Sequence, residues 1–64
     1  MITVNGTAQD LAGRTIREVL AALSMNDRGV AVAIDGEVVS KTRWDTTTAE
    51  DGAAIEVVTA VAGG

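Results

Sequence analysis

The sequence predicts a small α+β domain in which one helix lies across one face of a mixed five-stranded sheet. Its 64 residues are enough for a single domain. One stretch has helical periodicity, and strand-like segments on either side give the order β-β-α-β-β-β. Because one helix cannot cover both faces of a sheet, the opposite face is expected to stay partly open.

The first two strands are predicted to form a hairpin. Residues 1–4 alternate apolar and polar side chains, and Asn5-Gly6 follows them. Asn-Gly supplies the two positive-φ positions of a type I′ turn. Residues 7–11 are expected to return as a weaker strand.

The helix is the best-marked element. Thr15 and Glu18 stand three residues apart, which is the spacing of a capping box. A stripe at i, i+3, i+4 and i+7 predicts one buried helix face; it comprises Ile16, Val19, Leu20 and Leu23. The helix should end near residues 24–26, and Gly29 should close the connection to the next strand.

A second hairpin is predicted around Asp35-Gly36, another strong two-residue turn signal. Val30, Val32 and Ile34 should point to one face and the alanines between them to the other. Residues 41–52 are polar and irregular. Trp44, the only aromatic residue, is expected to cover one end of the core rather than to bind a partner.

The last strand has one face for the core and one for solvent. Ile55 and Val57 are assigned to the core, since Glu56 between them must stay in water. The first and last strands are expected to pair at the centre of the sheet. Together with the length and the single diagonal helix, this arrangement describes a β-grasp domain.

The composition argues against several classes of function. With five basic and nine acidic residues the net charge is −4, whereas nucleic-acid binding rests on lysine and arginine. Histidine and cysteine are absent, so neither a zinc site nor a nucleophile–base pair is expected. No metal or other cofactor is expected, and the scattered carboxylates do not suggest an enzyme. Neither a signal peptide nor a membrane span is predicted, so a cytoplasmic location is expected.

The sequence ends in Val61-Ala62-Gly63-Gly64. Glycines extend a strand poorly, so we expect a β-grasp domain over residues 1–61 and a flexible tail over residues 62–64. Four residues reach at most about 13–14 Å, which would place the carboxylate of Gly64 inside another protein's active site. Ala62 and Gly63 would form the narrow stem of this tail.

These features resemble the ThiS family, the ubiquitin-like sulfur carriers of thiamine biosynthesis. The resemblance rests on Val32-Ala33-Ile34-Asp35-Gly36, Val39, Trp44, Asp51-Gly52, Ile55 and Ala62-Gly63-Gly64. It implies that an ATP-dependent activating enzyme adenylates Gly64. A sulfur donor then converts the adenylate to a thiocarboxylate, and thiazole synthase takes the sulfur. The chain would be a carrier, and all catalysis would belong to its partners.

Two alternatives are open at this stage. One is a sulfur carrier of another pathway, such as molybdopterin, cysteine or thiolated-tRNA synthesis. The other is a β-grasp interaction module without sulfur chemistry. In either case, exposed apolar residues beside the tail suggest a partner-binding patch, for which we expect Val58, Ala60 and Val61.

Overall fold

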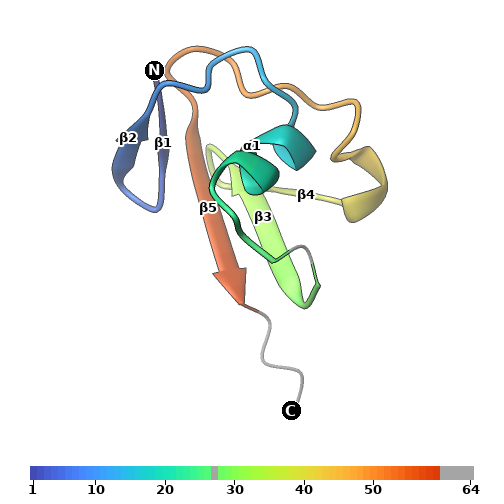
Figure 1. Ribbon diagram of the computed structural model, residues 1–64. Coiled ribbons are helices and arrows are strands. Elements are labelled where there is room, and N and C mark those ends of the chain that lie inside the picture. Colours follow the sequence, from blue (N-terminus) through green and yellow to red (C-terminus); the bar gives the residue numbers. More distant parts are fainter. Residues whose placement is uncertain (27, 60–64) are drawn as a thin grey trace.

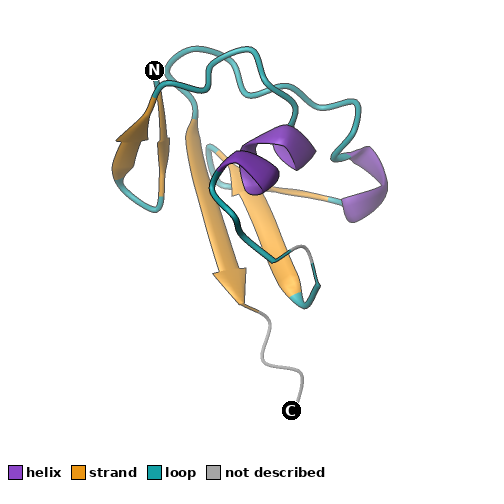
Figure 2. Ribbon diagram, viewed as in Figure 1, coloured by secondary structure: helices purple, strands orange, loops and turns teal. Residues whose placement is uncertain are grey.

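A computed structural model of the chain describes residues 1–26 and 28–59. Figure 1 shows a sheet with α1 lying across one face, and Figure 2 shows the loops that join the elements. The strands lie in the order β2-β1-β5-β3-β4. The elements are β1 (Ile2–Val4), β2 (Thr7–Gln9), α1 (Ile16–Ala22), β3 (Val30–Ile34), β4 (Glu37–Val39), the 3-10 turn η1 (Lys41–Arg43) and β5 (Ala54–Thr59).

The centre of the sheet confirms the predicted pairing of the first and last strands. β1 runs parallel to β5, with Thr3 opposite Ala54 and Val4 opposite Ile55. β3 runs antiparallel to β5 on its other side and pairs with five of its residues. β5 is therefore held from both sides, and it is the strand that leads to the end of the sequence.

Both predicted turns have the expected backbone. Asn5 and Gly6 have φ values of 52° and 85°, and Asp35 and Gly36 have 50° and 88°, as a type I′ turn requires. The return strand of the first hairpin is shorter than predicted, because β2 ends at Gln9. Leu11 instead packs against the core from the following loop.

The helix begins with the predicted capping box. The Glu18 N–H donates to the Thr15 hydroxyl at 3.2 Å, and the Thr15 N–H donates to the Glu18 carboxylate at 2.9 Å. The helix ends at Ala22 with Leu23 as its C-cap, and Ser24 takes a left-handed φ of 54°. Its buried face closes the core, which comprises Ile2, Val4, Ile16, Val19, Leu20, Val32, Trp44, Ala49, Ala53 and Ile55.

Trp44 belongs to the core, as predicted, with a relative exposure of 1%. Its indole N–H donates to the Val39 carbonyl at 3.0 Å, so the ring's one polar atom has a partner. The Arg17 guanidinium and the Lys41 ammonium lie 5.6 and 5.8 Å from the ring centre. The sequence did not predict the preceding η1 turn, which brings Trp44 under the helix.

Candidate functional site

Val58 is the one predicted site residue that the structure describes. It lies on the face of the sheet away from α1 and has a relative exposure of 58%, which confirms its predicted orientation. The other predicted site residues fall outside the described ranges; they are Ala60, Val61, Ala62, Gly63 and Gly64. Their roles remain proposals.

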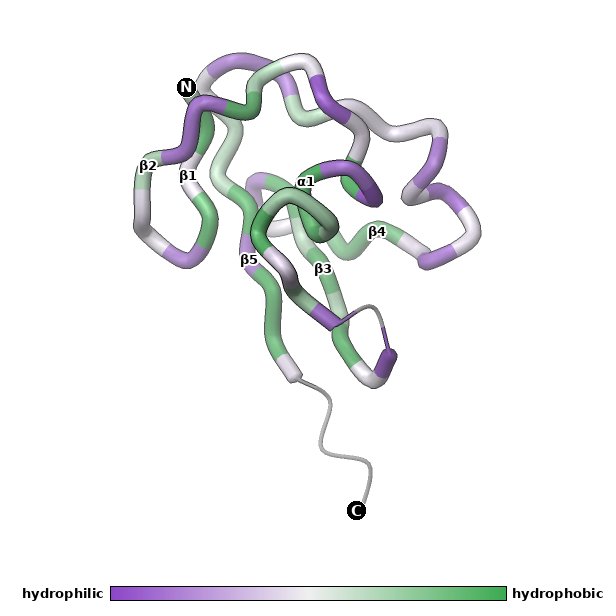
Figure 3. The backbone as a smooth tube through the Cα atoms, viewed as in Figure 1, coloured by the Kyte–Doolittle hydropathy of each residue, from purple (hydrophilic) through white to green (hydrophobic). Residues whose placement is uncertain are grey.

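A second exposed valine lies on the same face. Val38 has a relative exposure of 78%. Val38 is opposite Ala33 on β3, and Val58 is opposite Ala31 two residues away on the same strand. Figure 3 shows that apolar residues make up most of β3 and the latter part of β5. The structure therefore extends the predicted apolar patch across the sheet to β4.

Six residues of β3, β4 and β5 line a shallow groove of about 120 Å³ on this face, which we call the open-face groove. It is lined by Ala31, Val32, Ala33, Val38, Glu56 and Val58. The volume equals about four water molecules at about 30 Å³ each, so the groove can take the end of one side chain. It is much smaller than the pockets of about 300–1,000 Å³ that hold small-molecule ligands.

Sequence reasoning missed Val38, although a signal for it existed. Val38 and Val39 are adjacent, and composition alone does not say which of the two faces the helix. The two-residue turn fixes the register, so that Glu37 pairs with Ile34 and Val38 with Ala33. Since paired residues in a sheet share a face, the predicted alternation of β3 would have placed Val38 on the face of Ala33, opposite to that of Ile34.

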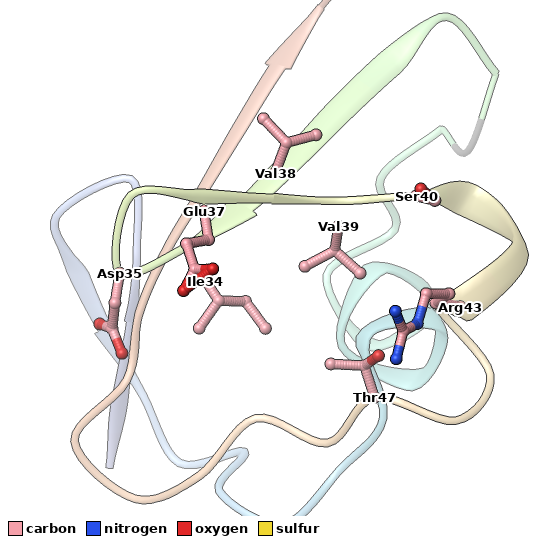
Figure 4. A pocket seen from close by; sticks show the side chains of 8 residues that line it. All are labelled: Ile34, Asp35, Glu37, Val38, Val39, Ser40, Arg43 and Thr47. Carbon is pink, nitrogen blue, oxygen red and sulfur yellow. The ribbon is translucent and has the colours of Figure 1, made fainter.

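A larger hollow of about 360 Å³ lies beside the second hairpin and shares Val38 with the open-face groove. Figure 4 shows its lining side chains, which come from the second hairpin, η1 and the loop after it; they are Ile34, Asp35, Glu37, Val38, Val39, Ser40, Arg43 and Thr47. Ile34 is opposite Ile55, near the start of β5. This hollow is therefore remote from the end of β5, where the predicted tail begins.

Asn5 fixes β5 at the point where β1 ends. Its side-chain N–H donates to the Val57 carbonyl at 3.1 Å, and its side-chain oxygen accepts from the Val57 N–H at 2.9 Å. The carboxamide thus takes the place of a strand residue beside β5. This pair of hydrogen bonds holds β5 at the residue before Val58.

Several acidic side chains of the described residues have structural partners. The Asp35 carboxylate accepts from the Ala54 N–H at 3.0 Å, and Asp45 pairs with Arg17 at 2.6 Å. Asp51 pairs with the N-terminal ammonium. The hydrogen bond and the positive charge of that ammonium hold the pKa of the Asp51 carboxyl below its usual value.

Within residues 1–26 and 28–59, no three carboxylates gather as metal ligands. In the same part of the chain no helix has the length and apolar character to cross a bilayer.

Comparison with known proteins identifies the family. The family model for the ThiS family matches residues 2–64. The chain belongs to the ThiS family. It is similar to the sulfur carrier protein ThiS of Thermus thermophilus, with 33% identity over 64 residues and complete coverage of both chains.

Two solved ThiS-family structures support the same assignment. A crystal structure of a thiamine biosynthesis protein (ThiS) from Geobacter metallireducens has a TM-score of 0.81 at 33% identity, over 98% of this chain and 97% of that one. An NMR structure of a thiamine biosynthesis protein from the same organism has a TM-score of 0.73 at 34% identity. The match covers 98% of this chain and 86% of that one. The predicted ubiquitin-like β-grasp fold is thereby confirmed.

Proposed function

We propose that this chain is a sulfur carrier of thiamine biosynthesis and that it carries the sulfur on the carboxyl group of Gly64. The observation that supports this most strongly is the ThiS-family match, which runs to Gly64. The T. thermophilus relative, named a sulfur carrier protein, is similar over its whole length. This full-length agreement favours thiamine biosynthesis over the other sulfur-carrier pathways.

The proposed chemistry follows from the poor reactivity of a carboxylate. An activating enzyme joins a Gly64 carboxylate oxygen to the α-phosphorus of ATP and releases pyrophosphate. The terminal sulfur of a persulfide donor then attacks the carbonyl carbon and displaces AMP. A second thiol removes the rest of the donor as a disulfide and leaves the thiocarboxylate, from which thiazole synthase takes the sulfur.

The geometry supports this role because β5 is firmly held up to its end. Asn5 holds β5 on one side at Val57, and β3 pairs with it as far as Thr59 on the other. Five residues follow Thr59 in the sequence, and their extended length is about 17 Å. A partner that grips the domain can thus receive Gly64 at a distance from the sheet. We place the domain boundary at residue 61.

In this proposal the chain contributes no catalytic group. Asp35, Asp45 and Asp51 form pairs within the fold. Activation, sulfur donation and thiazole formation belong to three partners, and the reactions take place in the cytoplasm.

Intact-mass measurement tests the function directly. The chain is incubated with its activating enzyme, ATP and a sulfide source, and a product heavier by the difference between one sulfur and one oxygen is expected. The sequence has no cysteine, so no thiol of the chain can produce a competing adduct. An unchanged mass, with an enzyme shown to be active on another carrier, would contradict the proposal.

Val58, Ala60 and Val61 are proposed to contact these partners. We expect Val58→Asp to weaken binding to the activating enzyme and to thiazole synthase, because a carboxylate would replace an exposed apolar contact. Ala21→Asp adds the same charge on the exposed side of α1 and should leave binding unchanged. Normal binding of a folded Val58→Asp variant to both partners would show that they bind elsewhere.

A further inference from the structure

One carboxylate lies among the apolar residues of the open face. Glu56 is opposite Ala33, which is in turn opposite Val38. Val58 follows two residues later on the same face of β5. Among the described residues, Glu56 is the only charged one that lines the open-face groove.

Glu56 also differs from most acidic residues in having no partner. Among the described residues, side-chain hydrogen bonds or ion pairs involve Glu18, Asp35, Asp45, Glu50 and Asp51. Asp10, Glu37 and Glu56 have no such partner in this part of the chain. Of these three, only Glu56 lies in the groove on the open face, because Glu37 pairs with Ile34 and shares the helix-side face.

An unpaired carboxylate restricts what can cover the groove. In the free protein Glu56 is exposed and hydrated. A partner surface laid over Val38 and Val58 would remove that water, and a buried carboxylate without a countercharge is strongly unfavourable. We therefore expect a partner that covers the groove to supply a cation.

An arginine side chain fits these requirements best. Its planar guanidinium can form two hydrogen bonds to one carboxylate. Its aliphatic stem can pack on apolar neighbours while the charged end reaches the acid, and Val38 and Val58 provide such neighbours. The groove volume of about 120 Å³ suits the end of one side chain.

We propose that the open-face groove docks a protein partner through an arginine that pairs with Glu56 and packs between Val38 and Val58. This rests on the proposed function, because the partner is the activating enzyme that acts on Gly64. Only Thr59 separates Val58 from the last five residues, so an enzyme bound at the groove lies within reach of the tail. The net charge of −4 favours encounter with a cationic surface.

The test measures the Kd for the activating enzyme at several NaCl concentrations. Glu56→Gln keeps the shape of the side chain and removes its charge. We expect its Kd to rise about tenfold or more, and to depend less on salt than that of the wild type. Adenylation at saturating carrier should keep its kcat while KM rises. The matched control is Glu37→Gln, which removes one charge from the other face and should bind as the wild type does.

Ala33→Leu tests the groove without changing any charge. Its larger side chain would fill the floor between Glu56 and Val38, so binding should weaken while the salt dependence stays that of the wild type. Unfolding curves of both variants establish that they are folded.

Two results would overturn the inference. One is a Glu56→Gln variant with wild-type Kd and salt dependence; the other is wild-type binding by Ala33→Leu. In both cases normal adenylation of the wild-type chain would leave the proposed function intact. Failure of the wild type to be adenylated would instead refute the proposed function, and this inference with it.

Discussion

Asn5 illustrates how a single side chain can complete a sheet. It occupies the first turn position with a φ of 52°, and its carboxamide makes both hydrogen bonds to Val57. The turn rests on local backbone chemistry, whereas the bonds to Val57 join segments distant in sequence. At this position the same asparagine does both.

Asn5→Gly separates these two roles. Glycine adopts positive φ freely, so the turn is kept while both hydrogen bonds to Val57 are lost. We expect the free energy of unfolding in urea to fall by about 1–2 kcal/mol, and the Val57 amide to exchange faster with deuterium. Asn5→Asp keeps the accepting oxygen and loses the donor. Its free energy of unfolding should therefore lie between those of the wild type and Asn5→Gly. Equal stability of all three proteins would contradict this account.

Asp51 provides a pH-dependent contribution to stability. Its pKa is lowered by the N-terminal ammonium, so the folded state binds this proton less readily than the unfolded state does. The contribution to stability is fully present at pH values above the unfolded-state pKa of about 3.9. It is lost as the pH falls through the lower pKa of the folded state. Because the carboxylate is fully exposed, salt should also reduce the effect.

The stability of Asp51→Asn should therefore differ from that of the wild type only at pH values above this range. We expect a lower melting temperature for the variant at pH 6 and low salt, and convergence of the two proteins in acid. Asp10→Asn is the control, because Asp10 has no such partner among the described residues. A difference that persists at pH 2 would show that the substitution acts by another route.

Among the elements, the stability of α1 depends on the packing of its buried face more than on the length of the helix. It has seven residues, and isolated helices shorter than about 12–15 residues are marginal in water. Ile16, Val19 and Leu20 are each at most 2% exposed. Packing against the sheet thus accounts for most of the helix's stability.

Leu20→Ala should destabilise the domain by about 2–5 kcal/mol, because it leaves a cavity in the core. Urea unfolding measures the change. Ala22→Ser, on the exposed side of the same helix, should have a small effect. A loss below about 1 kcal/mol for Leu20→Ala would mean that the surroundings collapse into the space or that the helix packs differently.

The elements that could be predicted are those with local signals. The capping box at Thr15 and Glu18, the two turns and the alternation in β3 and β5 each depend on neighbouring residues. The η1 turn and the burial of Ala49 and Ala53 have no such pattern. They follow from the loop before β5 crossing the core, where Arg14, Ile16 and Arg17 bond to its backbone.

For the whole molecule, the candidate site was predictable in part. The alternation of β5 correctly placed Val58 on the open face, and the last residues of the sequence suggested the tail. The open-face groove was not foreseen because it requires β3, β4 and β5 in register. Val38 and Glu56 are 18 residues apart in sequence, and Ala33 brings them together.

The tail can be tested separately from the domain. We expect Gly63→Val to abolish adenylation, because a β-branched side chain would not enter a narrow active-site channel. Deletion of Gly64 should do the same by removing the proposed reacting group. Both should leave the melting temperature unchanged, since both positions follow the last strand in the sequence and a glycine has no side chain to pack. Ala12→Val, in an exposed loop, should be adenylated normally.

Two results would contradict the proposed tail. If deletion of Gly64 unfolded the domain, the end of the chain would be structural. If Gly63→Val were adenylated at the wild-type rate, the enzyme would not require a stem without side chains.

The central place of β5 also has a consequence for synthesis of the chain on the ribosome. β1 and β3 do not pair with each other; both pair with β5, which is the last strand of the sheet. Contacts between segments so far apart in sequence form late, because a long loop must first close. The five-stranded sheet therefore cannot be completed before residue 59 has been added, because a shorter chain lacks part of the strand that joins the two hairpins. The sheet is thus completed at the end of synthesis, with only five residues of the sequence still to be added.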